Sequence, residues 1–298
     1  MIGTRFLKGQ GLGNQFWVYA VTRVIAASKG YGFSFLDSKQ FKGSGFLNLQ
    51  FESDAKFAGG TDESKFSNIY TERVVRHPKT GADISPWDPV LQNISDGTLI
   101  SGTMQSEKYL EGYRDDVINW FATEGEYFEG CVISLRGGEY RNLPDVFLPK
   151  SYYDDAISRV RELNPDVEFV VVTDDRKLAK VYFPNFAIVS SGGVKRFWRF
   201  YRHPKSERVG RDFSSIQHAK YLILSNSSFS WWGAYTNKVA ELIIAPKYWA
   251  RFNVSNGYWS NGDSLTKGWQ WLSKEGIFFS FDQCAQEYDL YRKNTSFH

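Results

Sequence analysis

Apolar residues near the start of the chain follow a helical spacing between two short hydrophobic runs. Residues 15–30, "QFWVYAVTRVIAASKG", carry apolar side chains at helical spacing and stop at Gly30, which predicts a helix. The runs at 2–8 and 31–36 are typical of strands. A strand, a glycine-containing turn, a helix and a second strand make up a βαβ unit.

A longer series of alternating strands and helices is predicted within residues 128–246. The strand-like runs are "CVISL", "VEFVVVT", "FAIVSS", "LILSN" and "ELIIAP". The helical segments between them are "KSYYDDAISRVRELNP", "RKLAKVYF", "DFSSIQHAKY" and "SFSWWGAYTNKVA". This alternation predicts a parallel sheet with helices on both faces. We therefore expect an α/β protein of two Rossmann-type domains, 1–127 and 128–298.

The remaining segments give weaker patterns. Residues 38–97 are rich in Gly, Ser, Asp and Pro and are expected to form loops and short elements. A strand near 98–103 and a helix over about 106–122 are predicted next, and a final helix near 282–293.

Composition narrows the class of protein. The 298 residues are 42% hydrophobic and 17% aromatic, and the net charge is +3. Because basic and acidic residues are nearly equal in number, the composition does not favour a broad nucleic-acid-binding surface. The aromatic side chains suit either a hydrophobic core or a sugar-binding cleft. No signal-peptide core and no apolar run of about 18 residues is found, so a cytoplasmic protein without a membrane span is expected.

Polar residues that follow the predicted strands are the candidates for chemistry, because ligands of doubly wound sheets lie beyond the carboxyl ends of the strands. The turn at 9–15, "GQGLGNQ", allows close backbone approach to a ligand, or is a simple βα turn. Arg136 follows "CVISL" and can bind a diphosphate. Glu139 is either a general base or the ion-pair partner of Arg136.

Two further strand ends carry polar side chains. The acids of "TDD" (173–175) suit ribose hydroxyls or a helix N-cap. Ser227 and Ser228 begin a predicted helix whose first N–H groups can face an anion. Trp231 and Trp232 in that helix are expected to pack against the sheet.

Several types of site are not supported by the sequence. No G-x-S-x-G surrounds the serines, the four histidines lack ligand spacing, and no Asp-x-Asp occurs. We therefore expect no metal site and no cofactor, with phosphate charge neutralised by Arg136, other basic side chains and helix termini.

Four segments, in chain order, resemble glycosyltransferase family 11, the α-1,2-fucosyltransferases. The run Ser-Phe-Ser-Trp-Trp-Gly is the most specific of these motifs, and the resemblance extends from residue 9 to about 253. The matching segments are "GQGLGNQFWVYA", "SGTMQSEKYL", "NSSFSWWGAYTN" and "IIAPKYW".

This resemblance implies a GT-B-like fold, with parallel sheets facing a central cleft, and metal-independent, inverting transfer of L-fucose from GDP-fucose to a glycan hydroxyl. The first domain would lie on the acceptor side. The second would bind the donor, with the final helix packing back on the first. The donor-binding positions carried over from the family are Gly13, Asn14, Gln15, Arg136, Asp212, Asn226, Ser227, Ser228 and Phe229. Arg136, Glu139 and Glu107 are the candidate catalytic residues, both glutamates as possible bases.

One motif departs from the family. His-x-Arg-Arg-x-Asp is replaced by Ser134-Leu135-Arg136-Gly137-Gly138-Glu139, which removes one positive charge. Lys195, Arg196 or Arg199 could supply a replacement. A transferase with another nucleotide-sugar donor, a catalytically impaired nucleotide-sugar- or glycan-binding protein, and a dinucleotide-dependent oxidoreductase are the alternatives.

Overall fold

The computed structural model describes residues 1–53, 63–76, 83–190, 205–254 and 265–295. The chain divides into two compact units, the first ending at Ala122 and the second beginning at Thr123, a few residues before the boundary expected from the sequence. Each unit contains a parallel sheet, as expected of the α/β class. A GT-B-like fold consists of two such units in succession along the chain, and this chain has both. The acceptor and donor roles of the two units remain predictions.

Unit 1 is built on a parallel sheet in the order β2-β1-β6-β3. Its strands are β1 (Ile2–Arg5), β2 (Phe33–Leu36), β6 (Thr98–Ser101) and β3 (Asn68–Thr71). Helix α1 (Leu12–Lys29) connects β1 to β2 and ends at Gly30, whose φ of 66° is in the left-handed region. The predicted βαβ unit is therefore confirmed.

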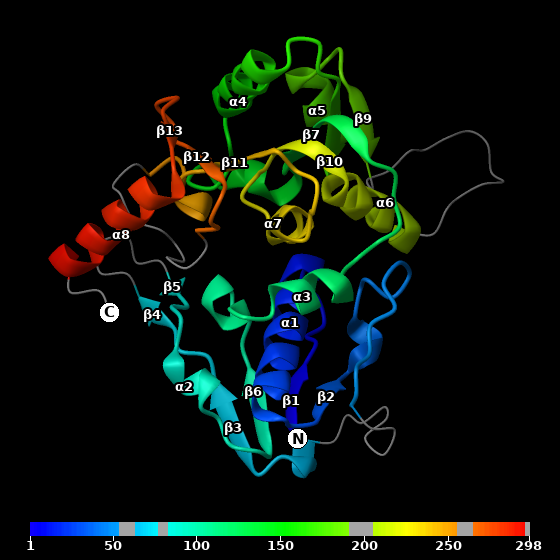
Figure 1. Ribbon diagram of the computed structural model, residues 1–298, viewed down its shortest axis with the longest axis vertical. Coiled ribbons are helices and arrows are strands. Elements are labelled where there is room, and N and C mark those ends of the chain that lie inside the picture. The colour runs from blue at the N-terminus through cyan, green and yellow to red at the C-terminus, as the bar shows by residue number, and fades with distance from the viewer. Residues whose placement is uncertain (54–62, 77–82, 191–204, 255–264, 296–298) are drawn as a thin grey trace. The chain divides into compact units, whose positions relative to one another are not determined.

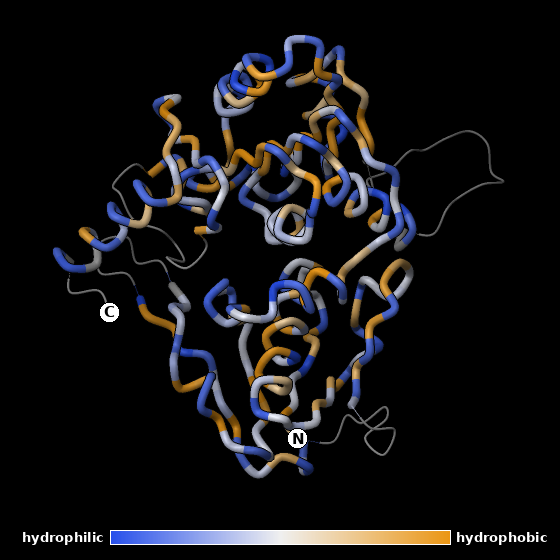
Figure 2. The backbone as a smooth tube through the Cα atoms, in the orientation of Figure 1, coloured by the Kyte–Doolittle hydropathy of each residue, from blue (hydrophilic) through white to orange (hydrophobic). Residues whose placement is uncertain are grey.

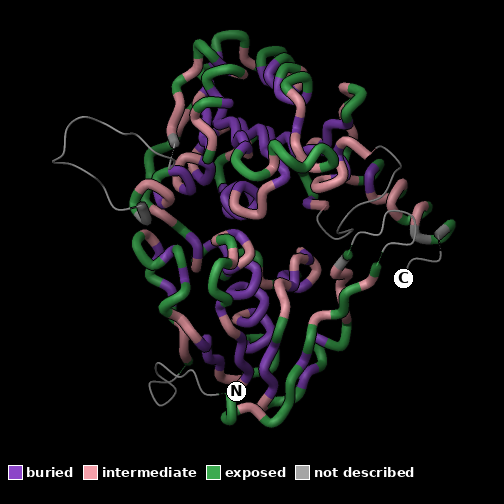
Figure 3. Tube along the Cα trace, turned by 180° about the vertical axis from the view of Figure 1, so that it is seen from behind, coloured by how far each residue is buried: buried purple, intermediate pink, exposed green. Residues whose placement is uncertain are grey.

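The core of unit 1 is largely aromatic. Phe35 stacks on Phe6 at 5.4 Å and on Tyr19 at 5.0 Å, measured between ring centroids. Most of α1 is buried (Figure 3) and its apolar positions are visible in Figure 2. This packing holds α1 against the sheet, and the glycine-containing turn connects the end of β1 to the start of α1.

The helix predicted over 106–122 is wrong, because the segment is broken in two. A 3₁₀ turn, η4 (Glu107–Leu110), is followed by α3 (Arg114–Trp120). Gly112 lies between them with φ of 80°, a backbone conformation incompatible with a continuous right-handed helix. The other short elements of unit 1 are η1 (Ser38–Gln40), η3 (Glu63–Lys65), β4 (Val75–Arg76), β5 (Asp83–Ile84) and α2 (Pro89–Gln92).

Unit 2 contains a sheet in the order β13-β12-β11-β10-β7-β8-β9, parallel except for β13. The strands are β7 (Phe128–Leu135), β8 (Phe169–Thr173), β9 (Ala187–Ser190), β10 (Ala219–Ile223), β11 (Leu242–Pro246), β12 (Gln270–Leu272) and β13 (Phe278–Phe279). The predicted parallel sheet is confirmed, whereas β12 and β13 were not predicted.

Helices cover both faces of this sheet, as expected. Figure 1 shows α4 and α5 on one face and α6 and α7 on the other. Side chains of α4, α5 and alternate strand positions form one buried cluster. The helices are α4 (Lys150–Leu163), α5 (Arg176–Tyr182), α6 (Lys205–Gln217), α7 (Ser228–Tyr235) and α8 (Phe281–Thr295). Two 3₁₀ turns, η5 (Gly138–Asn142) and η6 (Trp249–Arg251), are also present.

The final helix α8 follows the last strand directly and confirms the helix predicted near 282–293. Among the described residues, no helix combines the length and the apolar character needed to cross a bilayer.

Candidate active site

The sheet of unit 2 has a topological switch point between β7 and β10. The chain proceeds from β7 outward through β8 to β9, then returns to β10 on the opposite side of β7. In open parallel sheets a ligand crevice lies at such a point, beyond the carboxyl ends of the strands. A buried hydrogen bond of 3.2 Å between the hydroxyls of Ser134 and Ser225 joins the two strand ends there.

Arg136 lies two residues beyond that hydrogen bond and is held by two carboxylates. Its Nη2 donates to Glu139 Oε1 at 2.9 Å, and its Nη1 donates to Asp174. Asp174 also accepts the N–H of Gly137 at 2.8 Å. The guanidinium carbon lies 4.9 Å from the ring centroid of Tyr140. Arg136 is therefore in the predicted place with a defined orientation, and Glu139 is its ion-pair partner.

The acids of "TDD" have two different roles, of which only the helix N-cap was among the alternatives predicted from the sequence. Asp175 is the N-cap of α5, because its carboxylate accepts the N–H of Leu178 at 3.0 Å. Its neighbour Asp174 instead pairs with Arg136. Sequence reasoning missed this pairing. The available signal was that Asp174 and Arg136 each follow a buried strand, and adjacent parallel strands end at the same sheet edge.

The serines after β10 lie at the start of α7, as predicted. Ser227 is the N-cap in an extended conformation, and its side chain makes no capping hydrogen bond. Its carbonyl accepts the N–H of Trp231 at 2.9 Å. Ser227, Ser228 and Phe229 are half-buried. A helix N-terminus at a switch point suits an anionic group.

Two residues expected to bind the donor are buried instead. Asn226 is 3% exposed and its amide donates to the carbonyl of Val146, so it ties the end of β10 to the segment before α4. Asp212 lies in α6 and is 4% exposed. Lys195, Arg196 and Arg199 lie outside the described residues.

The indoles next to the serines pack in the core, as expected. Trp231 and Trp232 are both buried. Trp231 stacks on Tyr235 at 4.6 Å between ring centroids, and its Nε1 donates to the Thr266 hydroxyl at 3.2 Å. This packing holds α7, and hence the serines at its start, in a fixed position.

Unit 1 brings its own polar residues together at the ends of β1 and β6. The Gln105 amide donates to Asn14 Oδ1 at 2.8 Å, joining the "GQGLGNQ" turn to the "SGTMQSEKYL" segment. Gly13 is buried at the start of α1. Gln15 is fully buried, and its amide is bonded to the Gln40 carbonyl at 2.8 Å and the Lys42 N–H at 2.9 Å. Its buried position corrects the expectation that the Gln15 side chain binds the donor.

The "SGTMQSEKYL" segment is positioned by an acid that the sequence did not reveal. Glu72, just beyond β3, accepts the N–H groups of Thr103 at 2.7 Å and Met104 at 2.8 Å. Burial raises the pKa of the Glu72 carboxyl, and these hydrogen bonds lower it less than burial raises it. Met104 has a φ of 50°, so Glu72 holds a strained turn. Glu107 follows in η4 and is half-buried.

The described part of the chain contains no group of three or more His, Cys, Asp or Glu side chains arranged to hold a metal ion.

Comparison with known proteins relates the chain to bacterial glycosyltransferases. No family model matches. The O-antigen biosynthesis glycosyltransferase WbnK of Escherichia coli is 26% identical over 182 residues, which cover 52% of this chain and 56% of WbnK. An α-1,2-colitosyltransferase of Escherichia coli is 26% identical over 277 residues, covering 83% of this chain and 92% of that enzyme. Both curated relatives are glycosyltransferases.

Solved structures give weaker matches. The α-1,6-fucosyltransferase NodZ of Bradyrhizobium, co-crystallised with GDP, has a TM-score of 0.43 at 12% identity, covering 81% of this chain and 93% of NodZ. The Escherichia coli heptosyltransferase WaaC with ADP has a TM-score of 0.45 at 11% identity, covering 99% of this chain and 100% of WaaC. Likeness at that level supports no statement about activity.

Proposed function

We propose that the chain is a metal-independent, inverting glycosyltransferase that moves a sugar from a nucleotide diphosphate to a hydroxyl of a glycan. The observation that supports this most is that Arg136 and the start of α7 lie at the same end of neighbouring strands. Both lie within three residues of the Ser134–Ser225 hydrogen bond at the switch point of unit 2. A guanidinium and a helix N-terminus are two donors suited to one diphosphate.

The proposed transfer proceeds as follows. The acceptor oxygen forms a bond to the anomeric carbon, on the face opposite the diphosphate. The bond from that carbon to the diphosphate oxygen breaks, and its electron pair stays on the phosphate. Arg136 and the first N–H groups of α7 stabilise the charge that develops there.

The acceptor proton goes to a base or to water. Glu139 and Glu107 remain the candidates. As the base, Glu139 would accept the proton either while it is paired with Arg136 or after that ion pair has broken.

The carboxylates on Arg136 orient it without occupying all of its donors. A guanidinium has five N–H groups in a planar fork, and Glu139 and Asp174 bind through Nη2 and Nη1. Other N–H groups remain for a phosphate oxygen. Alternatively the diphosphate displaces Glu139, which is the more exposed of the two carboxylates.

GDP-fucose is the first donor candidate, because the sequence motifs resemble α-1,2-fucosyltransferases. The match to an α-1,2-colitosyltransferase over 83% of this chain makes a colitosyl donor the second candidate and supports the α-1,2 linkage. The match to an O-antigen biosynthesis enzyme supports an oligosaccharide, or a glycolipid or polysaccharide intermediate, as acceptor.

Calorimetric titration with GDP, UDP and CDP in the presence of a chelator tests the donor site. Binding of GDP that is unaffected by chelator and lost in Arg136→Ala is the expected result. Asp154→Asn, an exposed carboxylate paired with Lys150 on α4, is the control and should bind GDP normally.

Other outcomes separate the alternatives. Preference for UDP or CDP keeps the transfer chemistry and discards fucose. Nucleotide binding without transfer to any acceptor and without donor hydrolysis makes the chain a binding protein. A complete absence of nucleotide binding contradicts the proposal.

A further inference from the structure

The sheet of unit 1 has a topological switch point of its own, between β1 and β6. From β1 the chain passes to β2 on one side, whereas β6 and β3 lie on the other side of β1. In open parallel sheets a ligand lies beyond the carboxyl ends of the strands at such a point. The diphosphate contacts proposed above all come from unit 2, so a ligand at this end of unit 1 is still to be assigned.

Two amide side chains meet at this switch point. Gln105, in the segment after β6, donates through its amide to Asn14 Oδ1, in the turn after β1, at 2.8 Å. Both amides are half-buried, whereas the chain neighbours on either side of each are buried. The fold therefore directs the adjacent side chains inward and leaves this pair accessible.

The backbone that carries each amide is held in place. Glu72 accepts the N–H groups of the two residues before Gln105, at 2.7 and 2.8 Å. Gln15, next to Asn14, donates to the carbonyl of residue 40 at 2.8 Å. Because the two amides are positioned before a ligand arrives, binding costs less conformational entropy.

The chemistry of two amides suits hydroxyl groups. A primary amide has two N–H donors and an oxygen with two lone pairs, and the bond between the two side chains uses one of these positions on each. A sugar hydroxyl both donates and accepts, so it can bind to either amide. The oxygens of a diphosphate only accept, and they offer no donor to the Gln105 oxygen.

We infer that Asn14 and Gln105 bind two neighbouring hydroxyls of a neutral acceptor sugar. Two groups in hydrogen-bond contact lie at about the separation of adjacent hydroxyls on a sugar ring. Asn14 donates to one hydroxyl, and Gln105 Oε1 accepts from the next. This assignment rests on the proposed transferase function and differs from the donor role that the family resemblance implies for Asn14.

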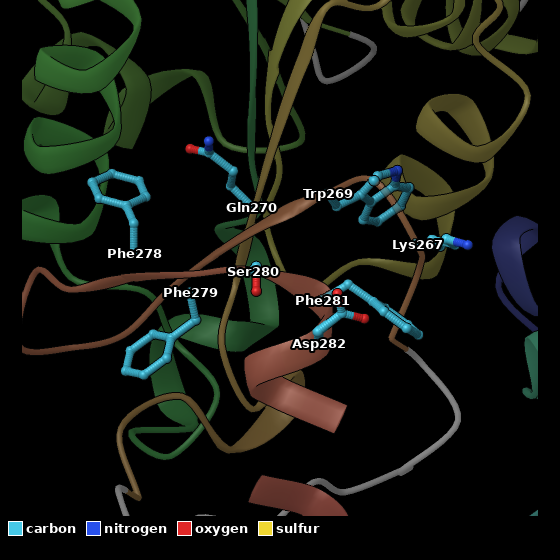
Figure 4. A pocket seen from close by; sticks show the side chains of 9 residues that line it. Lys267, Trp269, Gln270, Phe278, Phe279, Ser280, Phe281 and Asp282 are labelled. Carbon is cyan, nitrogen blue, oxygen red and sulfur yellow. The ribbon is translucent and has the colours of Figure 1, made fainter. Parts of the chain in front are cut away.

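A hollow of about 440 Å³ beside β12, β13 and α8 in unit 2 (Figure 4) is less suited to a sugar. Trp269 in its wall is 4% exposed, and the Phe279 ring has the Lys247 ammonium 3.3 Å from its centroid. Phe279 is opposite Trp271 in the strand pair, so Gln270 faces the other side of these strands. These groups do not face one ligand together, so we place the acceptor in unit 1.

Saturation-transfer NMR on the full chain in the presence of GDP tests the inference. The probes are the methyl β-glycosides of galactose, glucose and N-acetylglucosamine. We expect at least one to bind, with an affinity that falls by about tenfold in Asn14→Asp, as for loss of one or two hydrogen bonds. The introduced carboxylate still accepts the Gln105 N–H, so the two side chains stay joined, but it cannot donate to a hydroxyl.

Monodeoxy analogues of the bound glycoside give an independent measurement. Removal of the hydroxyl that Asn14 contacts should weaken binding to the wild type by about tenfold. Asn14→Asp should bind this analogue and the parent glycoside with similar affinity, because the contact is already lost. If Asn14 only maintained the loop, the analogue and the parent would keep their tenfold difference in the variant.

Two further variants complete the test. Gln105→Ala removes the second amide and should also lower glycoside affinity by about tenfold. Asn48→Asp makes the same chemical change at an exposed asparagine of unit 1, and it should bind the glycoside as the wild type does. Melting temperatures show whether any loss of affinity comes from unfolding, and that of Asn14→Asp should match the wild type.

Three results would overturn the inference. The first is the absence of binding by all three glycosides, and the second is unchanged affinity in both Asn14→Asp and Gln105→Ala. The third is loss of GDP affinity in Asn14→Asp with normal glycoside binding, which would return the pair to the donor site. Because GDP binding is measured on the same samples, failure of the proposed donor site appears as absence of GDP binding to the wild type, whereas failure of this inference leaves that binding unchanged.

Discussion

Asp174 binds Arg136 with one carboxylate oxygen and the N–H of Gly137 with the other, the latter at 2.8 Å. The side chain at the end of β8 thus fixes both the guanidinium and the backbone of the turn after β7. It acts on the proposed diphosphate site through Arg136.

Replacement of Asp174 by Asn should impair transfer more than donor binding. The amide still accepts from Gly137 but loses the charged pair, so Arg136 is less well oriented when charge develops on the diphosphate. We expect kcat to fall by about tenfold with a smaller change in KM. Steady-state kinetics with the identified donor measure this, with Asp154→Asn as the control. An unchanged kcat would show that Arg136 needs no orientation from β8.

The Ser134–Ser225 hydrogen bond should contribute to stability as a pair. Either single replacement by Ala leaves the other buried hydroxyl without its partner, at a cost of about 1–2 kcal/mol. The double variant removes both groups, so it should cost less than the sum of the single changes. Urea unfolding of the four proteins measures the coupling. Strict additivity would contradict a direct bond.

Glu72 should make stability depend on pH. Burial raises the pKa of its carboxyl in the folded state, so the folded protein holds the proton more tightly than the unfolded chain. Stability is then greatest below the ordinary pKa of a glutamate and falls as pH rises through the raised value. Urea midpoints between about pH 4 and pH 8 should show this fall in the wild type relative to Glu72→Gln. Parallel pH profiles in the two proteins would refute the assignment.

Gly112 should tolerate alanine poorly although the space around it is open. No atom lies within 4 Å of a Cβ added there, so the cost comes from its φ of 80°. We expect Gly112→Ala to lower the free energy of unfolding by about 1 kcal/mol.

The matched control is Gly11→Ala, which has equally open surroundings but a φ of −66° and should be neutral or slightly stabilising. Equal effects of the two substitutions in thermal unfolding would show that backbone strain at 112 is not the cause.

The sequence predicts the sheets well because their strands are buried. Runs such as "CVISL" and "VEFVVVT" are largely apolar, and a segment with helical spacing separates them, so the strand–helix alternation can be recognised without tertiary information. The positions of Arg136, Ser227 and Ser228 at strand ends follow from that alternation alone. Strands β12 and β13 have three and two residues, too few for a pattern to form.

The partners of the site residues were harder to predict. Arg136 and Asp174 are 38 positions apart, and their contact depends on β7 and β8 being neighbours in the sheet. Gln15 lies beside Asn14 in a turn that looks like a ligand-binding loop, yet the helix directs its side chain into the core. Local sequence does not distinguish these orientations, because both residues are polar and follow the same strand.

Gln15 and Glu72 hold their loops mainly through backbone atoms. Gln15 binds the carbonyl of residue 40 and the N–H of residue 42, and Glu72 binds the N–H groups of residues 103 and 104. Every amino acid except proline offers these same atoms. These backbone hydrogen bonds do not depend on which side chains residues 40, 42, 103 and 104 carry, so surface side chains of the loops can change while these bonds persist.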